Sequence, residues 1–148
     1  MEIERKFLIK ELPQNLERYD FHLIEQAYLC TEPVIRVRRE DDNYYMTYKS
    51  KGLLAREEYN LPLTKEAYET LKPKAEGNII SKKRILIPYN QYTIELDIFD
   101  APFAPLILAE VEFPTIDEAN AFVMPDWFQE DVTNDCKYHN SNMAMKDI

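Results

Sequence analysis

The chain has 148 residues, of which 45% are hydrophobic and 30% charged, a composition typical of a folded globular protein and not of a disordered one. Its formal net charge of −9 argues against nucleic acid or an anionic membrane as a partner, and no apolar stretch approaches the ~20 residues of a membrane-spanning helix. The length predicts one domain, 1–148, and a charged segment directly after Met1 excludes a secretory signal, so we expect a cytoplasmic protein.

Short segments of alternating polar and apolar residues follow one another along the chain and predict strands. They cover residues 1–9, 22–30, 33–40, 43–49, 55–61, 79–87, 92–99 and 107–113. Short turn sequences between several of them indicate antiparallel neighbours. Helices are predicted at 64–77, 115–123 and 137–146. The sequence therefore predicts an α+β protein built on an eight-stranded antiparallel β-barrel with a few flanking helices.

Charged side chains recur on one face of these strands, and they are sorted by sign from strand to strand. Four sets are basic or mixed: Lys6 with Glu2 and Glu4, Arg36 with Arg38, Lys49 with Lys51, and Arg56 with Glu58 and Asn60. The remaining sets are Lys82 with Arg84, Glu95 with Asp97, and Glu110 with Glu112. A solvated sheet face would account for any single strand. Repeated like charges two residues apart repel one another, which favours a face that binds something.

A basic cluster facing an acidic cluster can hold a polyphosphate anion together with divalent cations. Lysine and arginine bind phosphate oxygens, and carboxylates without histidine or cysteine suit Mg²⁺ or Mn²⁺ better than zinc. The chain has only two glycines, Gly52 and Gly77, so it contains no P-loop and no Rossmann fingerprint. Side chains would therefore have to hold the phosphates. With Lys137 included, the face takes nine of the 18 basic residues and seven of the 27 acidic ones, so we expect a net positive interior.

Several motifs along the chain resemble those of the CYTH superfamily, also called the triphosphate tunnel metalloenzymes. "EIERK" at 2–6 is similar to the E-x-E-x-K signature, and "IRVRR", "YYMTYKSKG", "AREEYN", "KKR", "IELDIF", "LAEVEF" and the ending "DVTNDCKYHNSNMA" follow in order. The likeness covers the whole chain and is greatest to the short bacterial single-domain members. It implies an antiparallel tunnel with charged walls that binds a triphosphate and one or two divalent metal ions.

The resemblance also implies roles for individual residues. Metal-binding positions correspond to Glu2, Glu4, Glu95, Asp97, Glu110 and Glu112. Phosphate-binding positions correspond to Lys6, Arg36, Arg38, Lys49, Arg56, Lys82, Arg84 and Lys137, the last reaching into the tunnel from the C-terminal helix. Lys51 is added only by its strand phase. Asn60 departs from the family pattern, which would place a glutamate there.

These residues predict a divalent-metal-dependent hydrolase of triphosphates, with inorganic tripolyphosphate as the favoured substrate. Catalytic roles fall to Glu4, Glu58, Lys82 and Arg84, of which the last two would stabilise the leaving pyrophosphate. Other members act as nucleoside or thiamine triphosphatases or as class IV adenylyl cyclases, so those activities stay open. A non-catalytic polyphosphate-binding module is the alternative of another class. The oligomeric state also stays open, with a homodimer as one alternative.

Overall fold

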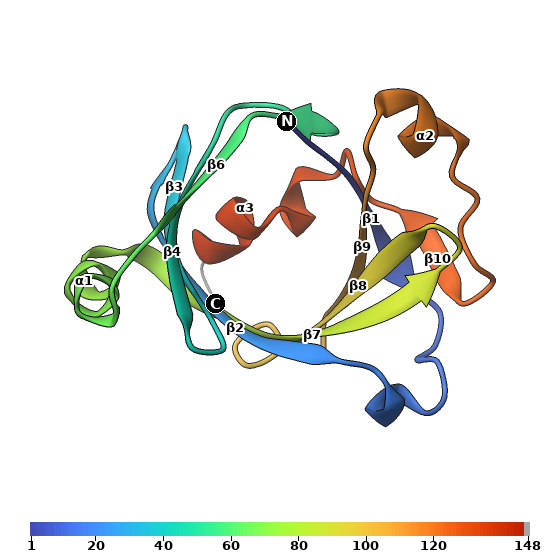
Figure 1. Ribbon diagram of the computed structural model, residues 1–148, viewed down its shortest axis with the longest axis horizontal. Coiled ribbons are helices and arrows are strands. Elements are labelled where there is room, and N and C mark those ends of the chain that lie inside the picture. The colour runs from blue at the N-terminus through green and yellow to red at the C-terminus, as the bar shows by residue number, and fades with distance from the viewer. Residues whose placement is uncertain (147–148) are drawn as a thin grey trace.

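The computed structural model describes residues 1–146, and antiparallel strands dominate it (Figure 1). The strands are β1 (Glu2–Ile9), β2 (Phe21–Thr31), β3 (Val34–Glu40), β4 (Asn43–Lys49), β5 (Ala55–Arg56), β6 (Glu58–Pro62), β7 (Glu76–Tyr89), β8 (Tyr92–Phe99), β9 (Ile107–Glu112) and β10 (Phe128–Asp131). The α-helices are α1 (Lys65–Leu71), α2 (Ile116–Ala121) and α3 (Asn140–Ala144), and the 3₁₀ turns are η1 (Leu16–Arg18), η2 (Lys72–Lys74) and η3 (Cys136–Tyr138).

The strands form one antiparallel sheet that curls into a barrel. Their order is β10-β1-β9-β8-β7-β2-β3-β4-β6, and the short β5 pairs with β1. The segment 55–62 therefore closes the barrel between β1 and β4, because β5 pairs with β1 at Glu2↔Arg56 while β6 pairs with β4 at Lys49↔Glu58. All the paired strands run antiparallel, which confirms the predicted α+β class and barrel architecture.

The number of strands differs from the predicted eight, for two local reasons. The predicted strand 55–61 is divided at Glu57, where the backbone leaves β1 and turns to β4; Ser50 N donates to Glu57 O (3.0 Å) at this point. The additional strand β10 lies in a stretch for which no strand is predicted from the sequence. It pairs with the C-terminal part of β1, for example at Phe7↔Asp131. A four-residue strand with little alternation carries almost no periodic signal.

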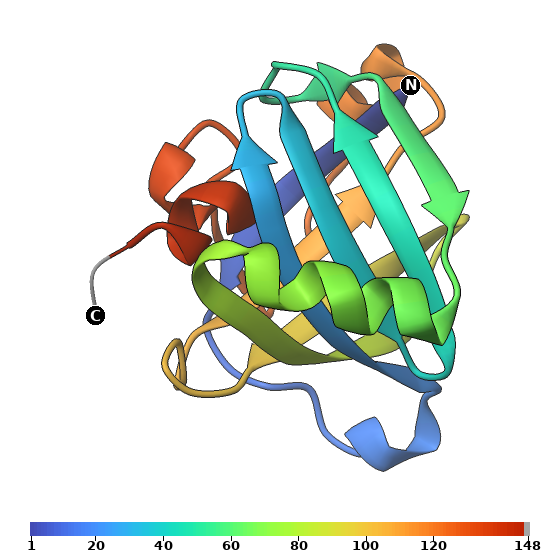
Figure 2. The ribbon, with the colours of Figure 1, turned by 90° about the vertical axis from the view of Figure 1, so that its left-hand side faces the viewer.

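Helices and β10 cover the outside of the barrel. Helix α1, capped by Thr64, lies across the outer face of the strands that include β3 and β4, where Tyr68 packs on Ala27 and Val37 (Figure 2). Helix α2 and β10 cover the other side, and the fully buried Phe7 and Phe128 pack there. The outward phase of β1 is apolar except for Arg5, which pairs with Asp131 of β10, while the inward phase carries Glu2, Glu4 and Lys6. None of the helices in residues 1–146 is long and apolar enough to cross a membrane.

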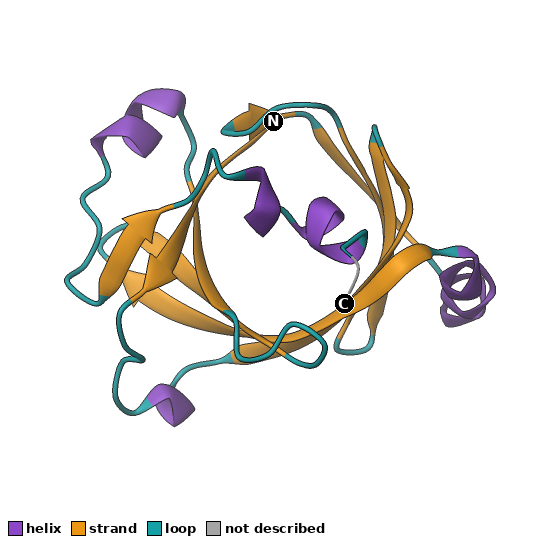
Figure 3. Cartoon of the chain, turned by 180° about the vertical axis from the view of Figure 1, so that it is seen from behind, coloured by secondary structure: helices purple, strands orange, loops and turns teal. Residues whose placement is uncertain are grey.

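The C-terminal segment lies against one end of the barrel (Figure 3). The helix predicted at 137–146 is broken by extended backbone at His139 into η3 and α3. Met143 and Ala144 of α3 pack against inward-phase apolar residues, including Tyr28 and Ile80. Gly77 permits this approach, because its φ is +72° and an added Cβ would lie 2.2 Å from the Ala144 carbonyl oxygen. The tail therefore fills the apolar end of the barrel, and the charged cavity occupies the rest.

Candidate functional site

The barrel encloses a cavity of about 370 Å³ whose lining is almost entirely polar. Its walls are formed by Glu2, Glu4, Lys6, Tyr28, Val34, Arg36, Arg38, Glu40, Tyr45, Thr47, Lys49, Arg56, Glu58, Asn60, Arg84, Glu95, Glu110, Glu112, Asn140 and Ser141. Each strand from β1 to β9 contributes at least one residue to the lining. These residues share a side because alternate residues of a strand point in the same direction. The face predicted to bind a ligand is thus the inner face of the barrel.

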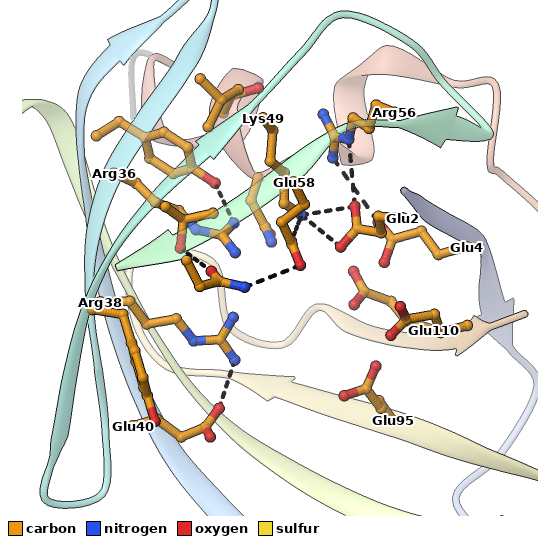
Figure 4. A pocket seen from close by; sticks show the side chains of 18 of the residues that line it. Glu2, Glu4, Arg36, Arg38, Glu40, Lys49, Arg56, Glu58, Glu95 and Glu110 are labelled. Atoms are coloured by element: carbon orange, nitrogen blue, oxygen red, sulfur yellow. Dashed lines mark hydrogen bonds and ion pairs between the residues drawn. The ribbon is translucent and has the colours of Figure 1, made fainter. Parts of the chain in front are cut away.

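Carboxylates from β1, β8 and β9 form one wall, which we call the acidic wall: Glu2, Glu4, Glu95, Glu110 and Glu112 (Figure 4). Strand pairing brings them together, since Glu4 lies opposite Glu112 and Glu95 lies opposite Glu110. Antiparallel partners that share a face have Cβ atoms only about 5 Å apart. The pairing of β1, β9 and β8 therefore gathers these carboxylates on one side of the cavity.

The pKa values of three of these carboxyls report how crowded the acidic wall is. Burial raises the pKa of Glu4, and the neighbouring Glu110 and Glu2 charges raise it further. Burial also raises the pKa of Glu112, together with the charges of Glu2 and Glu4. The pKa of Glu95 is raised to about 7, again mainly by burial. Each of these groups would be stabilised as an anion by additional positive charge.

The opposite wall, which we call the arginine wall, is formed by Arg36 and Arg38 on β3 (Figure 4). Arg36 Nη1 donates to the Tyr28 hydroxyl (3.3 Å), and Arg38 Nη2 donates to Glu40 Oε1 (2.8 Å). The Nε atoms of both arginines are buried without a hydrogen-bond partner among the described residues. Burial, with the nearby Arg84 and Arg36 charges, lowers the pKa of Arg38. The positive charge of Arg38 is therefore only partly compensated by the protein, whereas the pKa of Arg36 is raised, despite its burial, by the Tyr28 hydroxyl and the Glu2 and Glu58 charges.

Lys49 and Arg56 connect the two walls on the side closed by β5 and β6. Lys49 Nζ donates to Glu2 Oε1 (2.9 Å) and lies 3.2 Å from Glu58 Oε2. Arg56 Nε lies 3.5 Å from Glu2 Oε1. On β1, Lys6 Nζ lies 3.3 Å from Glu110 Oε1 and donates to the Tyr138 carbonyl (3.2 Å). These lysines and Arg56 already neutralise part of the acidic wall.

Asn60 lies in the cavity at the position where the family pattern would place a glutamate. The Thr47 hydroxyl donates to Asn60 Oδ1 (2.6 Å), and Asn60 Nδ2 donates to Glu58 Oε1 (3.2 Å). The amide thus keeps a hydrogen bond to Glu58 that a second carboxylate, having no donor, could not make. This chain has one negative charge fewer beside Lys49 than the family pattern implies.

Lys82 and Asp97 share the inward strand phase of Arg84 and Glu95, but their side chains do not line the cavity. Both are buried, and they pair with each other at 2.7 Å between Nζ and Oδ2. Arg84 completes this network: its Nε and Nη2 donate to Asp97 (2.7 and 2.9 Å), Nη1 to Glu95 (2.9 Å), and Nη2 also to Glu110 (2.8 Å). Both carboxylate oxygens of Asp97 thus accept hydrogen bonds from Lys82 or Arg84. The Arg84 guanidinium donates to three carboxylates, those of Asp97, Glu95 and Glu110. Their predicted roles in metal binding and leaving-group stabilisation stay predictions.

Two further basic residues lie outside the cavity, and the expectation that they point into it is wrong. Strand β4 ends at Lys49, so the alternation does not continue to Lys51, whose side chain is 79% exposed and pairs with Glu32. Lys137 is on η3, 69% exposed, with Nζ 3.7 Å from Asp135. The cavity is accordingly lined by six basic and seven acidic side chains, so its interior is not net positive as expected.

Sequence analysis missed several cavity residues. Glu40 is in phase with Arg36 and Arg38, and extending the alternation by one step would have found it. Tyr28, Tyr45 and Thr47 follow the same period but are not charged, and the charge-based search passed over them. Gln26, between Ile80 and Arg38 in the sheet, does not line the cavity but is fully buried, and neither of its side-chain polar atoms has a hydrogen-bond partner within residues 1–146. Asn140 and Ser141 reach the cavity through tertiary packing of α3, which has no sequence signal.

The donor set of the acidic wall suits a hard divalent cation. Carboxylate oxygens are the ligands that Mg²⁺ and Mn²⁺ prefer, and the raised pKa values of Glu4, Glu95 and Glu112 mark a need for positive charge. In residues 1–146 no three acidic, histidine or cysteine side chains converge closely enough to surround an ion. Lys6, Lys49 and Arg84 hold several carboxylates apart, so an ion on Glu2, Glu4, Glu110 and Glu112 would require side-chain rearrangement.

Comparison with known proteins places this architecture in a family. Residues 1–132 match the sequence profile of the CYTH domain. An inorganic triphosphatase of Nitrosomonas europaea is 39% identical, with 97% of each chain covered, and one of Acetivibrio thermocellus is 34% identical, with 97% of this chain and 92% of that protein covered. A solved structure of an inorganic triphosphatase superposes with a TM-score of 0.74 at 35% identity, covering 99% of this chain and 95% of that one. The chain therefore belongs to the CYTH domain family.

Proposed function

We propose that this protein is a divalent-metal-dependent hydrolase that cleaves inorganic tripolyphosphate to pyrophosphate and phosphate within the cavity. The observation that carries the proposal is the pairing of an acidic wall with an arginine wall across one enclosed space. Basic side chains bind phosphate oxygens, and carboxylates bind the metal that accompanies them. Two relatives that align over nearly their whole length carry the name inorganic triphosphatase, which supports the same activity here.

The size of the cavity favours a compact substrate. A volume of about 370 Å³ lies near the lower end of the roughly 300–1,000 Å³ range of small-molecule pockets. Thirteen charged side chains in the lining suit an anion that is charged along its whole length, while Tyr28, Val34 and Tyr45 offer few apolar contacts to a nucleobase or a thiazolium ring. Inorganic tripolyphosphate therefore fits the cavity better than ATP or thiamine triphosphate.

Each wall has a distinct role in the proposed reaction. Arg36, Arg38 and Lys49 bind the phosphate chain and hold the attacked phosphorus in line with a water molecule. One or two Mg²⁺ or Mn²⁺ ions, held by Glu2, Glu4, Glu110 and Glu112, would neutralise charge that develops on the phosphoryl oxygens. Glu58 accepts a proton from the attacking water, and Lys49 and Asn60 fix its carboxylate by hydrogen bonds or ion pairing.

The basic residues of the cavity also bear on the leaving group and on the class of molecule that the protein binds. Arg84 is the basic residue of the β7 network that lines the cavity, so it stabilises the leaving pyrophosphate, and Lys82 supports it through Asp97. The partner is a small phosphorylated anion and not nucleic acid or a membrane. A cytoplasmic location and a homodimeric state stay predictions.

A substrate panel tests the proposal. We expect purified protein to release phosphate from tripolyphosphate with Mg²⁺ or Mn²⁺, to lose this activity in EDTA, and to act much more slowly on ATP and thiamine triphosphate. Preference for ATP or thiamine triphosphate, or formation of cyclic AMP, would favour the corresponding family activity instead. Tight calorimetric binding of tripolyphosphate without turnover would indicate a binding module.

A matched pair of variants tests the role of the acidic wall. Glu4→Gln should lower kcat/KM for tripolyphosphate by roughly 10²–10³-fold, the usual cost of one electrostatic contact to a transition state. Glu66→Gln, on the exposed face of α1, removes the same charge outside the cavity and should leave activity unchanged. Activity that is independent of metal, or full activity of Glu4→Gln, would refute the proposal.

A further inference from the structure

Strand β3 presents a row of four side chains to the cavity, and the last of them has the opposite charge from its neighbours. The inward positions are Val34, Arg36, Arg38 and Glu40, and all four line the cavity. Successive inward positions on a strand are roughly 7 Å apart, since the chain rises about 3.3 Å per residue. The two arginines thus occupy the middle of the row, and Glu40 ends it.

The carboxylate of Glu40 is held against the second arginine. Arg38 Nη2 donates to Glu40 Oε1 at 2.8 Å, and the Glu40 side chain is 28% exposed (Figure 4). A carboxylate oxygen bound to a guanidinium occupies a place that a phosphate oxygen would take, because both are anionic acceptors of the same donors. Glu40 is therefore the terminal acceptor along this row of β3.

The other end of the row is closed by the C-terminal segment. Val34 packs in the apolar cluster that contains Met143 and Ala144 of α3, and Asn140 and Ser141 of α3 line the cavity. A linear phosphate chain bound along Arg36 and Arg38 cannot grow toward α3 without displacing it. Additional phosphates would extend toward Glu40.

We propose that Glu40 limits the length of the phosphate chain that the cavity accepts, as a specificity-determining residue for triphosphate over tetraphosphate and longer chains. This inference rests on the proposed triphosphatase function. A fourth phosphate would lie beside the Glu40 carboxylate and compete with it for Arg38. Repulsion between the Glu40 carboxylate and a phosphate group disfavours the longer substrate much more than tripolyphosphate. Specificity for tripolyphosphate would thus come from a contact that disfavours the wrong ligand.

Steady-state kinetics of Glu40→Gln on inorganic tripolyphosphate and inorganic tetraphosphate test this inference. Glutamine keeps the size of the side chain and its amide oxygen can still accept from Arg38, while the negative charge is lost. We expect the ratio of kcat/KM for tetraphosphate to kcat/KM for tripolyphosphate to rise about tenfold, mainly through a lower KM for tetraphosphate. The kcat for tripolyphosphate should stay within about twofold of the wild-type value.

Asp42→Asn is the matched control, because Asp42 is exposed in the adjoining turn and does not line the cavity. This variant loses the same charge two residues away, and its substrate ratio should equal that of the wild type. An unchanged ratio in Glu40→Gln, or an equal loss of activity on both substrates, would overturn the inference. Failure of the wild-type protein to hydrolyse tripolyphosphate would instead refute the proposed function, so the two failures are distinguishable.

Discussion

Arg38 on β3 and Arg84 on β7 line the same cavity from strands separated only by β2, yet the charges around them differ. The Arg84 guanidinium is bound by Asp97, Glu95 and Glu110, and despite its burial these anions raise its pKa well above the ordinary value. Arg38 has a single carboxylate partner, Glu40, and burial together with Arg84 and Arg36 lowers its pKa. The charge of Arg84 is thus compensated by surrounding carboxylates, whereas the charge of Arg38 is compensated only in part.

The difference indicates that two arginines on strands separated only by β2 differ in their structural importance. Arg84 and Asp97 form a buried ionic network that fixes the acidic wall in place. Arg38 and Arg36 hold positive charge that an anionic ligand can compensate, and each has an Nε donor without a partner among the described residues. Substitution on the Arg84 side should therefore lower stability strongly in addition to any effect on catalysis, while substitution on the Arg38 side should lower activity with little effect on stability. The following predictions test this contrast, beginning with the largest expected effect.

Replacing Arg84 by methionine should produce the largest loss of stability. Asp97, Glu95 and Glu110 would lose their shared cation while remaining largely buried, and breaking a buried ionic network typically costs about 3–5 kcal/mol of unfolding free energy. Denaturant unfolding measures this cost. Lys83→Met removes a charge from the exposed face of the same strand and should cost less than about 1 kcal/mol. Equal effects of the two substitutions would contradict the structural role of Arg84.

Replacing Arg38 by alanine should instead reduce catalysis with little loss of stability. The kcat/KM for tripolyphosphate should fall roughly 10²–10³-fold, because a phosphate-binding charge is removed. The unfolding free energy should change by less than about 1 kcal/mol, since the loss of a repelling neighbour offsets the loss of the pair with Glu40. Arg39→Ala, at the exposed adjacent position, should retain wild-type activity. Equal decreases in unfolding free energy for Arg38→Ala and Arg84→Met would contradict the proposed difference between the two arginines.

The acidic wall should make stability depend on pH through Glu95. Its folded-state pKa is about 7, raised mainly by burial from an ordinary value of 4.5, so the folded protein holds a proton there that the unfolded chain has released. This contribution to stability is complete below pH 4.5 and disappears as the pH rises through 7, and it amounts to on the order of 2 kcal/mol.

Unfolding free energies measured in EDTA between pH 4.5 and 8 test this linkage. The fall in stability with rising pH should be smaller in Glu95→Gln than in the wild type, because glutamine does not titrate. Glu66→Gln, which removes the same charge from the exposed face of α1, serves as the control. Parallel pH profiles for the wild type and Glu95→Gln would show that Glu95 does not titrate in this range.

The smallest effects are expected at Lys51 and Lys137. Both side chains are exposed and lie outside the cavity lining, so alanine at either position should leave kcat/KM for tripolyphosphate within about twofold of the wild-type value. Steady-state assays in parallel with Arg38→Ala measure this directly. A hundredfold loss in Lys137→Ala would restore the role that the family resemblance implies for this residue.

Periodicity in the sequence was sufficient to predict the barrel and most of the inner face. A strand that points one residue type inward and another outward repeats every two residues, so Glu2, Glu4, Arg36, Arg38 and Glu110 could be assigned to one face before any pairing was known. The prediction failed where the period ends. Lys51 follows the last residue of β4, and the alternation that placed Lys49 inward does not apply to it.

Other features of the site depend on tertiary contacts that no local pattern records. Strand phase places Lys82 and Asp97 inward, but only the packed barrel shows that they are buried in a pair with each other, that Arg84 binds Asp97, and that neither lines the cavity. Asn140 and Ser141 reach the cavity because α3 folds back across the barrel end, where Gly77 allows it to approach β7. The division of labour between Arg38 and Arg84 likewise depends on which carboxylates each guanidinium meets in the folded protein.

A phosphorus-31 NMR time course tests the central claim most directly. Wild-type protein is incubated with inorganic tripolyphosphate and Mg²⁺, with a parallel sample in EDTA. We expect the tripolyphosphate resonances to decay in the Mg²⁺ sample only, and orthophosphate and pyrophosphate to appear in equal amounts. Persistence of tripolyphosphate with either Mg²⁺ or Mn²⁺, or equal decay in EDTA, would contradict a metal-dependent triphosphatase.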